Sequence, residues 1–334
     1  MNVQIARSWS KNGFGVYLIV LLCAAILLFL ASCSSSGSDR SEVSDEGTPD
    51  DPPELSVVIN SIDLDECPTV KVFLSVADEN LQLIQDDLAL SVNLFEDGIE
   101  QTNNFILEWK DDLQAPITIV FAMDYSLSMS DTSIADMEAG VKAFVDAMGP
   151  GDQAAIIKFF YEPQVMTGLT SDKAALYNAV DQPPDSRDYT NIYDTVFEAA
   201  NIAAGGGGQL AIILLTDGEH VVIPSYPVYH TMEEAIDNAK QQQVPVFSIA
   251  LGLRDDSDIK YISQETGGIF YPILDSSVIS EIYMSLFDLL DSQYMISYTS
   301  AAADGLQHSI QLSAEYNGVT GESIIRNFFL CPAP

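Results

Sequence analysis

Residues 117–129 read ITIVFAMDYSLSM, and their pattern indicates the class of the fold. Its first seven residues are apolar apart from one threonine, which is typical of a strand buried on both faces of a parallel sheet. One carboxylate and two hydroxyls follow directly, in Asp124-Tyr125-Ser126-Leu127-Ser128. In open α/β sheets, ligands bind beyond the carboxyl ends of the strands. The stretch therefore predicts a buried strand with a functional site at its end.

The same pattern continues along the chain to residue 290. Further apolar segments are typical of strands, at residues 154–160, 210–215, 244–251 and 268–273. Segments with helical periodicity alternate with them, at residues 134–148, 172–180, 192–204, 231–243, 257–266 and 276–290. This alternation predicts an α/β domain at residues 116–292, with a doubly wound, mainly parallel sheet and helices on both faces.

Short alternating strands flank this domain on both sides. They are expected at residues 55–64, 69–78, 88–97, 103–109, 294–300, 308–316 and 322–330. Turn signals such as Asp97-Gly98 separate them, because this pair accepts positive φ at low cost. We expect residues 55–113 and 293–334 to pack together as one β-sandwich, with the α/β domain inserted between them.

Each flank carries one cysteine, Cys67 in the first and Cys331 in the last. Lone cysteines outside the cytoplasm usually pair, so we expect a Cys67–Cys331 disulfide that joins the flanks. Two free buried thiols are the alternative.

The N-terminus predicts export. A basic start precedes the apolar run at residues 14–31, which is typical of a signal-peptide core. The following Leu30-Ala31-Ser32-Cys33 resembles a bacterial lipobox, which implies that residues 1–32 are a lipoprotein signal peptide and that Cys33 is acylated. An uncleaved transmembrane helix is the alternative, because the run is near the shortest length that spans a bilayer.

Ser34 resembles the sorting signal of outer-membrane lipoproteins, so we expect a lipid-anchored protein of the bacterial cell envelope that faces the periplasm or the surface. Residues 33–54 are rich in Ser, Asp, Glu and Pro and are expected to form a flexible acidic tether.

The composition excludes two classes of protein. With 13 basic and 49 acidic residues the net charge is −36, which repels phosphate backbones and excludes nucleic acid as a main partner. The 3 His and 4 Cys are too few for a framework of repeated zinc sites.

Two further polar residues belong with the Asp-x-Ser-x-Ser sequence. Asp217 follows the apolar strand 210–215, and Thr190 stands just before a predicted helix. Together with Asp124, Ser126 and Ser128 they offer only hard oxygen donors, which favour Mg²⁺, Mn²⁺ or Ca²⁺ over zinc or copper.

These five positions resemble the metal-ion-dependent adhesion site of the von Willebrand factor type A (VWA) domain, and the resemblance covers about residues 116–292. It implies that Ser126, Ser128 and Thr190 bind a divalent cation directly, while Asp124 and Asp217 hold its waters. It also implies Mg²⁺ as the first candidate, and a partner protein whose Asp or Glu carboxylate completes the coordination.

The resulting expectation is a lipid-anchored binding protein that is not an enzyme. An envelope scaffold with a structural metal and a metal-assisted hydrolase are the alternatives. No histidine stands at a spacing that implies a base for Ser126 or Ser128. We interpret His220 as an exposed loop residue, with contact at the rim of the site as the alternative, and His230 and His308 as surface or turn residues.

Overall fold

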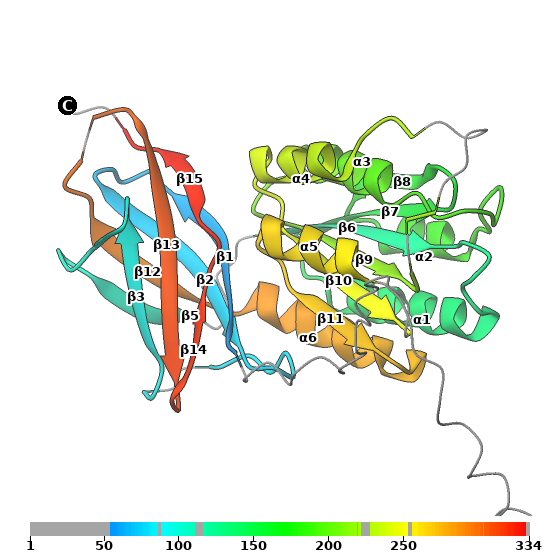
Figure 1. The fold of residues 1–334 in the computed structure, drawn as a ribbon, viewed down its shortest axis with the longest axis horizontal. Coiled ribbons are helices and arrows are strands. Elements are labelled where there is room, and N and C mark those ends of the chain that lie inside the picture. Colours follow the sequence, from blue (N-terminus) through cyan, green and yellow to red (C-terminus); the bar gives the residue numbers. More distant parts are fainter. Residues whose placement is uncertain are drawn as a thin grey trace, which may run out of the picture. The chain divides into compact units, whose positions relative to one another are not determined.

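The computed structural model describes residues 54–85, 88–110, 116–218, 220–221, 228–252, 256–302 and 304–331 (Figure 1). The expected signal peptide, Cys33 and nearly all of the tether lie outside the described residues. Within those ranges, no helix combines the length and the apolar character needed to cross a membrane.

The central sheet has six strands in the order β11-β10-β9-β6-β7-β8. They are β6 (Ile117–Asp124), β7 (Gln153–Phe159), β8 (Pro163–Thr170), β9 (Gln209–Thr216), β10 (Val246–Leu251) and β11 (Phe270–Ile273). All pair in parallel except β8, which runs antiparallel to β7 at the edge. Strand β8 was not predicted, because it has no buried residue and so shows no apolar face.

Helices cover both faces of this sheet, as predicted. They are α1 (Asp131–Ala147), α2 (Lys173–Asp181), α3 (Ile192–Ala203), α4 (Met232–Gln241), α5 (Ser257–Thr266), the short 3-10 helix η1 (Ser276–Val278) and α6 (Ile279–Asp291). On one face, Phe121 and Met123 of β6 pack in a core with α1, α2 and α6. On the other, Val120 and Ala122 pack with α3, α4 and α5. All eight residues of β6 are buried, which explains its continuous apolar run.

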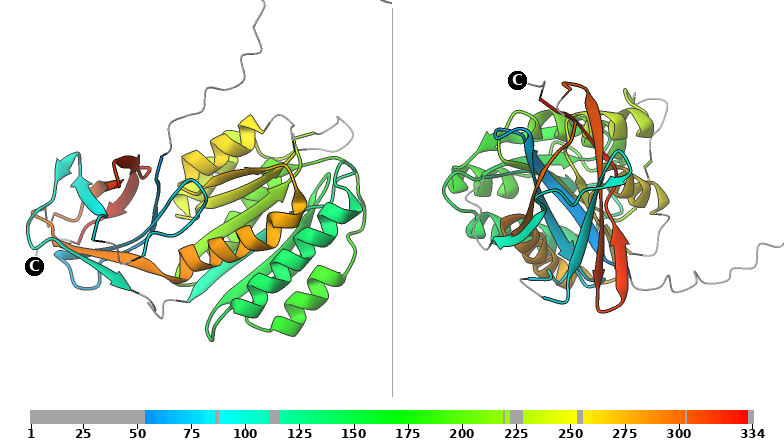
Figure 2. Two further views of the ribbon diagram at one scale, coloured as in Figure 1. Left: turned by 90° about the horizontal axis from the view of Figure 1, so that it is seen from below. Right: turned by 90° about the vertical axis from the view of Figure 1, so that its left-hand side faces the viewer.

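Helices α1 and α6 lie side by side (Figure 2) and approach closely at Gly140. A Cβ at Gly140 would stand 2.6 Å from Cδ2 of Tyr283, whose ring is fully buried against Phe121. Only glycine fits between the two helices at this point.

We expect Gly140→Ala to destabilise the protein by about 1–2 kcal/mol, because overpacking costs about 1–3 kcal/mol and alanine recovers up to about 1 kcal/mol of helix propensity. Urea unfolding measures the change. Gly207→Ala is the matched control, since a Cβ there meets no atom within 4 Å. A Gly140→Ala protein as stable as this control would contradict the packing argument.

The flanking strands form two sheets, ordered β1-β2-β12-β5 and β14-β13-β3-β4, with β15 also paired to β13. Their bounds are β1 (Ser56–Asp63), β2 (Thr69–Ala77), β3 (Ser91–Glu96), β4 (Ile99–Glu100), β5 (Ile106–Lys110), β12 (Gln293–Thr299), β13 (Gln307–Tyr316), β14 (Val319–Glu322) and β15 (Arg326–Phe329). Strand β12 pairs with β2 and β5, and β13 pairs with β3, so each sheet mixes strands from both flanks. The α/β domain is therefore inserted into the sandwich.

One predicted strand is shorter than expected, since only β15 lies within it and β14 shares just its last residue with it. Residues 322–330 were expected to be continuous, but β14 ends at Glu322 and β15 begins at Arg326. The hydroxyl of Ser323 accepts the backbone N–H of Leu312 at 2.9 Å, and thus occupies a donor of β13 between the two paired segments. The chain leaves the ladder here and rejoins it at Arg326.

Two further links join parts of the chain that are distant in sequence. Cys67 and Cys331 form a disulfide with their Cα atoms 6.2 Å apart, the pairing expected from the two lone cysteines. The sandwich also bonds to the end of α6, because the buried Ser75 hydroxyl donates to the carbonyl of Leu289 at 2.6 Å.

His308 is buried in the sandwich, so its interpretation as a surface or turn residue is wrong. Its ring lies between Asp97 in the β3–β4 turn (Nδ1–Oδ2, 2.7 Å) and Asp304 before β13 (Nε2–Oδ1, 3.0 Å). Glu96 of β3 is 3.6 Å away, and the ring of Phe328 on β15 packs nearby. The hydrogen bonds to Asp304 and Asp97 outweigh desolvation and raise the pKa of His308.

This raised pKa predicts a pH-dependent contribution to stability. The folded protein holds the proton more tightly than the unfolded chain, so the contribution is full below about pH 6.5 and is lost as the pH rises through the folded pKa. Urea unfolding at pH 5.5 and 9 should show that His308→Gln destabilises the protein more at the lower pH. An equal loss at both pH values would contradict this assignment.

Candidate metal centre

Asp124 ends the central strand β6 and is fully buried. Its Oδ1 accepts the N–H of Ser126 at 2.7 Å, and its Oδ2 accepts the hydroxyl of Thr216 at 2.6 Å. Burial raises the pKa of Asp124 to about 6, although these hydrogen bonds act in the opposite direction, and the nearby Asp217 adds to the rise. These bonds hold the carboxylate of Asp124 in place at the carboxyl end of the central strand. Among the described residues, no basic side chain is hydrogen-bonded to it.

Hydrogen bonds connect the two serines to the second carboxylate. The hydroxyls of Ser126 and Ser128 lie 3.0 Å apart, and Ser128 donates to Oδ1 of Asp217 at 2.7 Å. Asp217 directly follows β9, the neighbour of β6 in the sheet. Parallel neighbouring strands therefore bring four of the five predicted residues into one hydrogen-bonded group.

Thr190, the fifth residue, reaches the same edge through its backbone. It forms an antiparallel bridge with Val221, with N–O distances of 2.9 Å in both directions. The N–H of Leu127 also donates to the carbonyl of Asp188 at 3.0 Å, which joins the Thr190 loop to the Asp-x-Ser-x-Ser loop. Within the described residues the side chain of Thr190 forms no hydrogen bond with the other four.

His220 also lies beside this group, and its interpretation as an exposed loop residue is wrong. Its ring is half-buried and stacks on Tyr193 with a centroid distance of 3.7 Å. Its Nδ1 accepts the N–H of Ile192, the first residue of α3, at 3.1 Å. Burial lowers the pKa of His220, which suits the neutral ring that this acceptor role requires. The residue positions the loop after Asp217 against the start of α3.

His230 has a similar structural role and is not a simple surface residue. Its ring stacks on Phe197 at 3.6 Å, and its Nδ1 lies 2.9 Å from Oδ1 of the buried Asp194. Asp194 also accepts the backbone N–H groups of Tyr229 and His230. These bonds attach the segment before α4 to the first turn of α3.

Two apolar residues next to the serines of the motif, Tyr125 and Met129, lie behind the site, whereas Leu127 between the serines is exposed. Tyr125 and Met129 are buried. The Tyr125 hydroxyl donates to Glu138 at 2.5 Å, and the ammonium of Lys158 lies 4.3 Å from the centroid of its ring. Tyr125 and Met129 therefore belong to the hydrophobic core beneath the motif and form no apolar rim.

The donor set fits a hard cation. In the described part of the chain, His, Cys, Asp and Glu side chains alone form no group of three or more that could hold a metal ion. A metal at this edge would therefore need hydroxyl oxygens as well as the carboxylates. Asp124 and Asp217 supply two carboxylates. Ser126 and Ser128 supply hydroxyls from the loop after β6, and Thr190 supplies a third from the loop before α3. Such neutral and anionic oxygens can replace waters around Mg²⁺, Mn²⁺ or Ca²⁺.

Thr216 was missed by the sequence reasoning, and it provides a test of the site. Thr216→Val keeps the side chain's shape but removes a donor to a buried carboxylate, so we expect a loss of about 1.5–3 kcal/mol. Urea unfolding should show a smaller loss for Thr195→Val, a matched control whose buried hydroxyl donates to the neutral carbonyl of Asn191. Equal losses would mean that Asp124 does not depend on this bond.

The curated relatives come from mycobacteria. A UPF0353 protein of Mycolicibacterium paratuberculosis is 24% identical over 225 residues, which cover 59% of this chain and 65% of the relative. A UPF0353 protein of Mycobacterium avium is 22% identical over 239 residues, or 63% of this chain and 69% of the relative. The chain thus spans about two thirds of the length of these relatives.

Two solved structures resemble this chain, and a family model identifies the domain. The mussel byssus proximal thread matrix protein 1, in a structure with a zinc-occupied MIDAS motif, is 22% identical and covers 57% of this chain and 49% of its own (TM-score 0.47). A von Willebrand factor type A protein of Catenulispora acidiphila is 13% identical and covers 84% and 74% (TM-score 0.45). Residues 118–285, half of the chain, match the von Willebrand factor type A domain model, and the chain belongs to this family.

Proposed function

We propose that this protein is a lipid-anchored binding protein of the bacterial cell envelope that captures a partner carboxylate through a divalent cation. The observation that carries the proposal is the hydrogen-bonded group of Asp124, Ser126, Ser128 and Asp217, with the Thr190 loop bonded to the same edge. All five side chains present oxygen, and no basic side chain bonds to the four connected ones within the described residues.

The proposed roles follow from charge and chemistry. The hydroxyls of Ser126, Ser128 and Thr190 would bind the metal directly, and Asp124 and Asp217 would hold its waters. Two carboxylates balance a divalent cation without excess negative charge, so the metal remains able to attract one more anionic oxygen. Mg²⁺ is the first candidate, and Mn²⁺ and Ca²⁺ fit the same donors.

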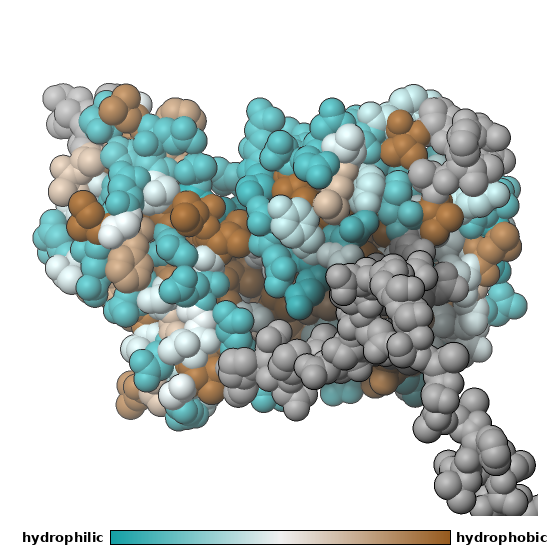
Figure 3. Space-filling model, viewed as in Figure 1, coloured by the Kyte–Doolittle hydropathy of each residue, from teal (hydrophilic) through white to brown (hydrophobic). Residues whose placement is uncertain are grey.

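The partner would be a protein that offers an Asp or Glu side chain. The chain's net charge of −36 repels such a partner, and the face shown in Figure 3 is largely hydrophilic. Charges on the surface are screened beyond about 8–10 Å at physiological salt, so a metal at the site can dominate locally. The cation therefore makes the site attractive to an anion on an otherwise repulsive surface.

Binding is favoured over catalysis by the partners of the serines. Ser128 donates to Asp217, and the nearby His220 uses its Nδ1 to accept the N–H of Ile192. A nucleophilic serine needs a base that takes its proton, and in this arrangement the ring that lies nearby is engaged elsewhere. The lipid anchor at Cys33 and an outer-membrane location complete the proposal, on the basis of the N-terminal sequence.

Calorimetric titration with MgCl₂ and MnCl₂ tests the site. We expect one saturable site in the wild type and at least tenfold weaker binding in Asp124→Ala and Ser128→Ala, because each loses an oxygen of the group. Asp131→Asn is the matched control, because it removes an exposed carboxylate three residues after Ser128. It should bind like the wild type.

Equal binding by all four proteins would contradict the metal site. A partner that is still captured after removal of the metal would favour the scaffold alternative. Ester or phosphoester hydrolysis that follows the Mg²⁺ concentration would favour the hydrolase alternative.

A further inference from the structure

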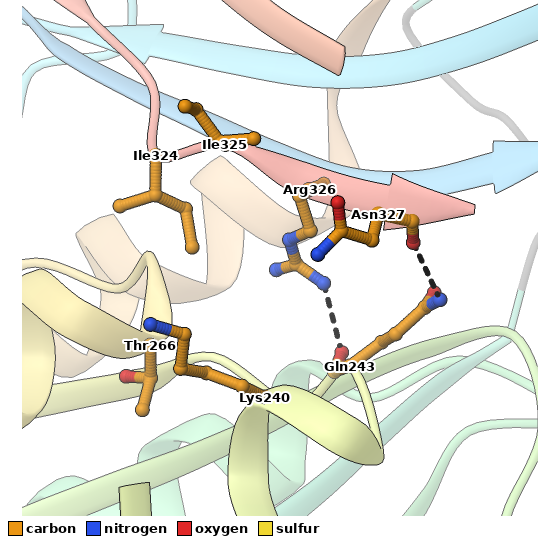
Figure 4. Close-up of a pocket in the computed structure, with 7 residues that line it drawn as sticks. All are labelled: Lys240, Gln243, Thr266, Ile324, Ile325, Arg326 and Asn327. Atoms are coloured by element: carbon orange, nitrogen blue, oxygen red, sulfur yellow. Dashed lines mark hydrogen bonds between the residues drawn. The ribbon is translucent and has the colours of Figure 1, made fainter. Parts of the chain in front are cut away.

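Arg326 carries a buried positive charge that the described protein groups only partly satisfy. It is the first residue of β15, is 7% exposed, and points from the sandwich toward the C-terminal ends of α4 and α5 (Figure 4). Its Nη1 donates to the carbonyl of Gln243 at 3.1 Å. Its Nε and Nη2 have no hydrogen-bond partner among the described residues, and no described carboxylate lies within 4 Å of the guanidinium.

Such a group is costly unless something compensates it. Burial lowers the pKa of Arg326 to about 10, so the side chain still carries its charge at neutral pH. A buried cation without an anion or a full set of acceptors destabilises the fold. One backbone carbonyl satisfies one of five donors, so an additional acceptor is expected beside it.

A cavity adjoins this side chain. Arg326 lines a cavity of about 70 Å³ together with Lys240, Thr266, Ile324 and Asn327. One water needs about 10–15 Å³ on this measure, so the cavity holds several waters or a small anion. The ammonium of Lys240 adds a second positive charge and is paired at 2.9 Å with Glu265, both partly exposed.

The cavity is separate from the candidate metal centre. Thr266, which lines it, accepts the N–H of Val246, the first residue of β10, at 3.0 Å. It therefore lies at the amino end of a parallel strand, whereas Asp124 and Asp217 lie at carboxyl ends. A ligand there would also bridge the sandwich and the α/β domain, because the lining residues come from both.

We propose that this cavity is a binding site for a small oxyanion, either phosphate or a carboxylate, held by the guanidinium of Arg326 with Lys240 at the rim. Arginine presents paired N–H donors that match two oxygens of a carboxylate or phosphate. Nε and Nη2, the two nitrogens without partners, are such a pair. The ligand would supply the charge and the acceptors that the protein lacks at this point.

Titration with sodium phosphate and with sodium acetate tests the proposal, at constant ionic strength and without divalent cations, so that the metal centre does not contribute. Calorimetry and the thermal midpoint are the two measurements. We expect saturable binding of at least one anion by the wild type, and at least tenfold weaker binding by Arg326→Met. The stronger of the two anions identifies the ligand chemistry.

Lys142→Gln is the matched control. It removes one positive charge of an exposed pair with Asp181 outside the cavity, so it should bind like the wild type. Lys240→Gln should weaken binding less than Arg326→Met does. If Arg326→Met fails to fold, two other measurements test the proposal. Lys240→Gln should bind the anion more weakly than the wild type, and a crystal structure of the wild type in phosphate should show density at Nε and Nη2 of Arg326.

Two results would overturn the proposal. Absence of saturable binding by the wild type would mean that water alone satisfies Arg326. An equal response of the wild type, Arg326→Met and Lys142→Gln would mean that the anions act only by screening the acidic surface.

Discussion

The candidate site depends on one constraint, a carboxylate buried at the end of a strand that is itself buried on both faces. Asp124 is shielded from bulk solvent there, so the surrounding chain must supply hydrogen bonds to its carboxylate. The N–H of Ser126 does so from the turn after β6, and the hydroxyl of Thr216 does so from the end of the adjacent strand β9. The same requirement fixes the turn after β6 and the end of β9, and thereby the positions of Ser128 and Asp217.

The insertion into a sandwich places a second constraint on this domain. Helix α6 runs directly into β12, which lies between β2 and β5 in the sandwich. At this junction Asn60 donates to both Ser75 and Gln293, and Ser75 donates to Leu289. A buried polar network tolerates little sliding, because every displaced donor loses its partner. The end of α6 is therefore fixed to the sandwich by direction-specific bonds as well as by apolar packing.

Much of this architecture could be predicted from the sequence because its signals are local. The apolar run of β6, the helical periodicity beside it and the Asp97-Gly98 turn each carry their own physical reason. Strand β8 lacks a buried face, and the break at Ser323 depends on a hydroxyl that bonds across to Leu312. The edge strand β8 and the break at Ser323 depend on the tertiary structure, so no local sequence pattern predicts them.

The histidines show the same limit. Ring stacking of His220 on Tyr193 and the two carboxylates around His308 involve partners between 4 and 211 residues away. The proximity of Asp124, Ser126, Ser128 and Asp217 was easier to predict, because the carboxyl ends of parallel strands must meet at one edge whatever the loops contain. Arg326 was not singled out, since nothing in its neighbouring sequence indicates that its side chain is buried.

Two basic side chains, Lys158 and Arg326, are buried in this acidic chain, and both need acceptors. The chain has 49 acidic and 13 basic residues, so most of its carboxylates repel one another in solvent. A cation in the core is no longer solvated by water and needs protein or ligand acceptors instead. Lys158 meets this need with the carbonyls of Val180 and Gln182 and with Glu138 at 3.8 Å. Arg326 has one carbonyl and a cavity. This difference between two buried cations is why we interpret the space beside Arg326 as a site for an anion rather than as a packing defect.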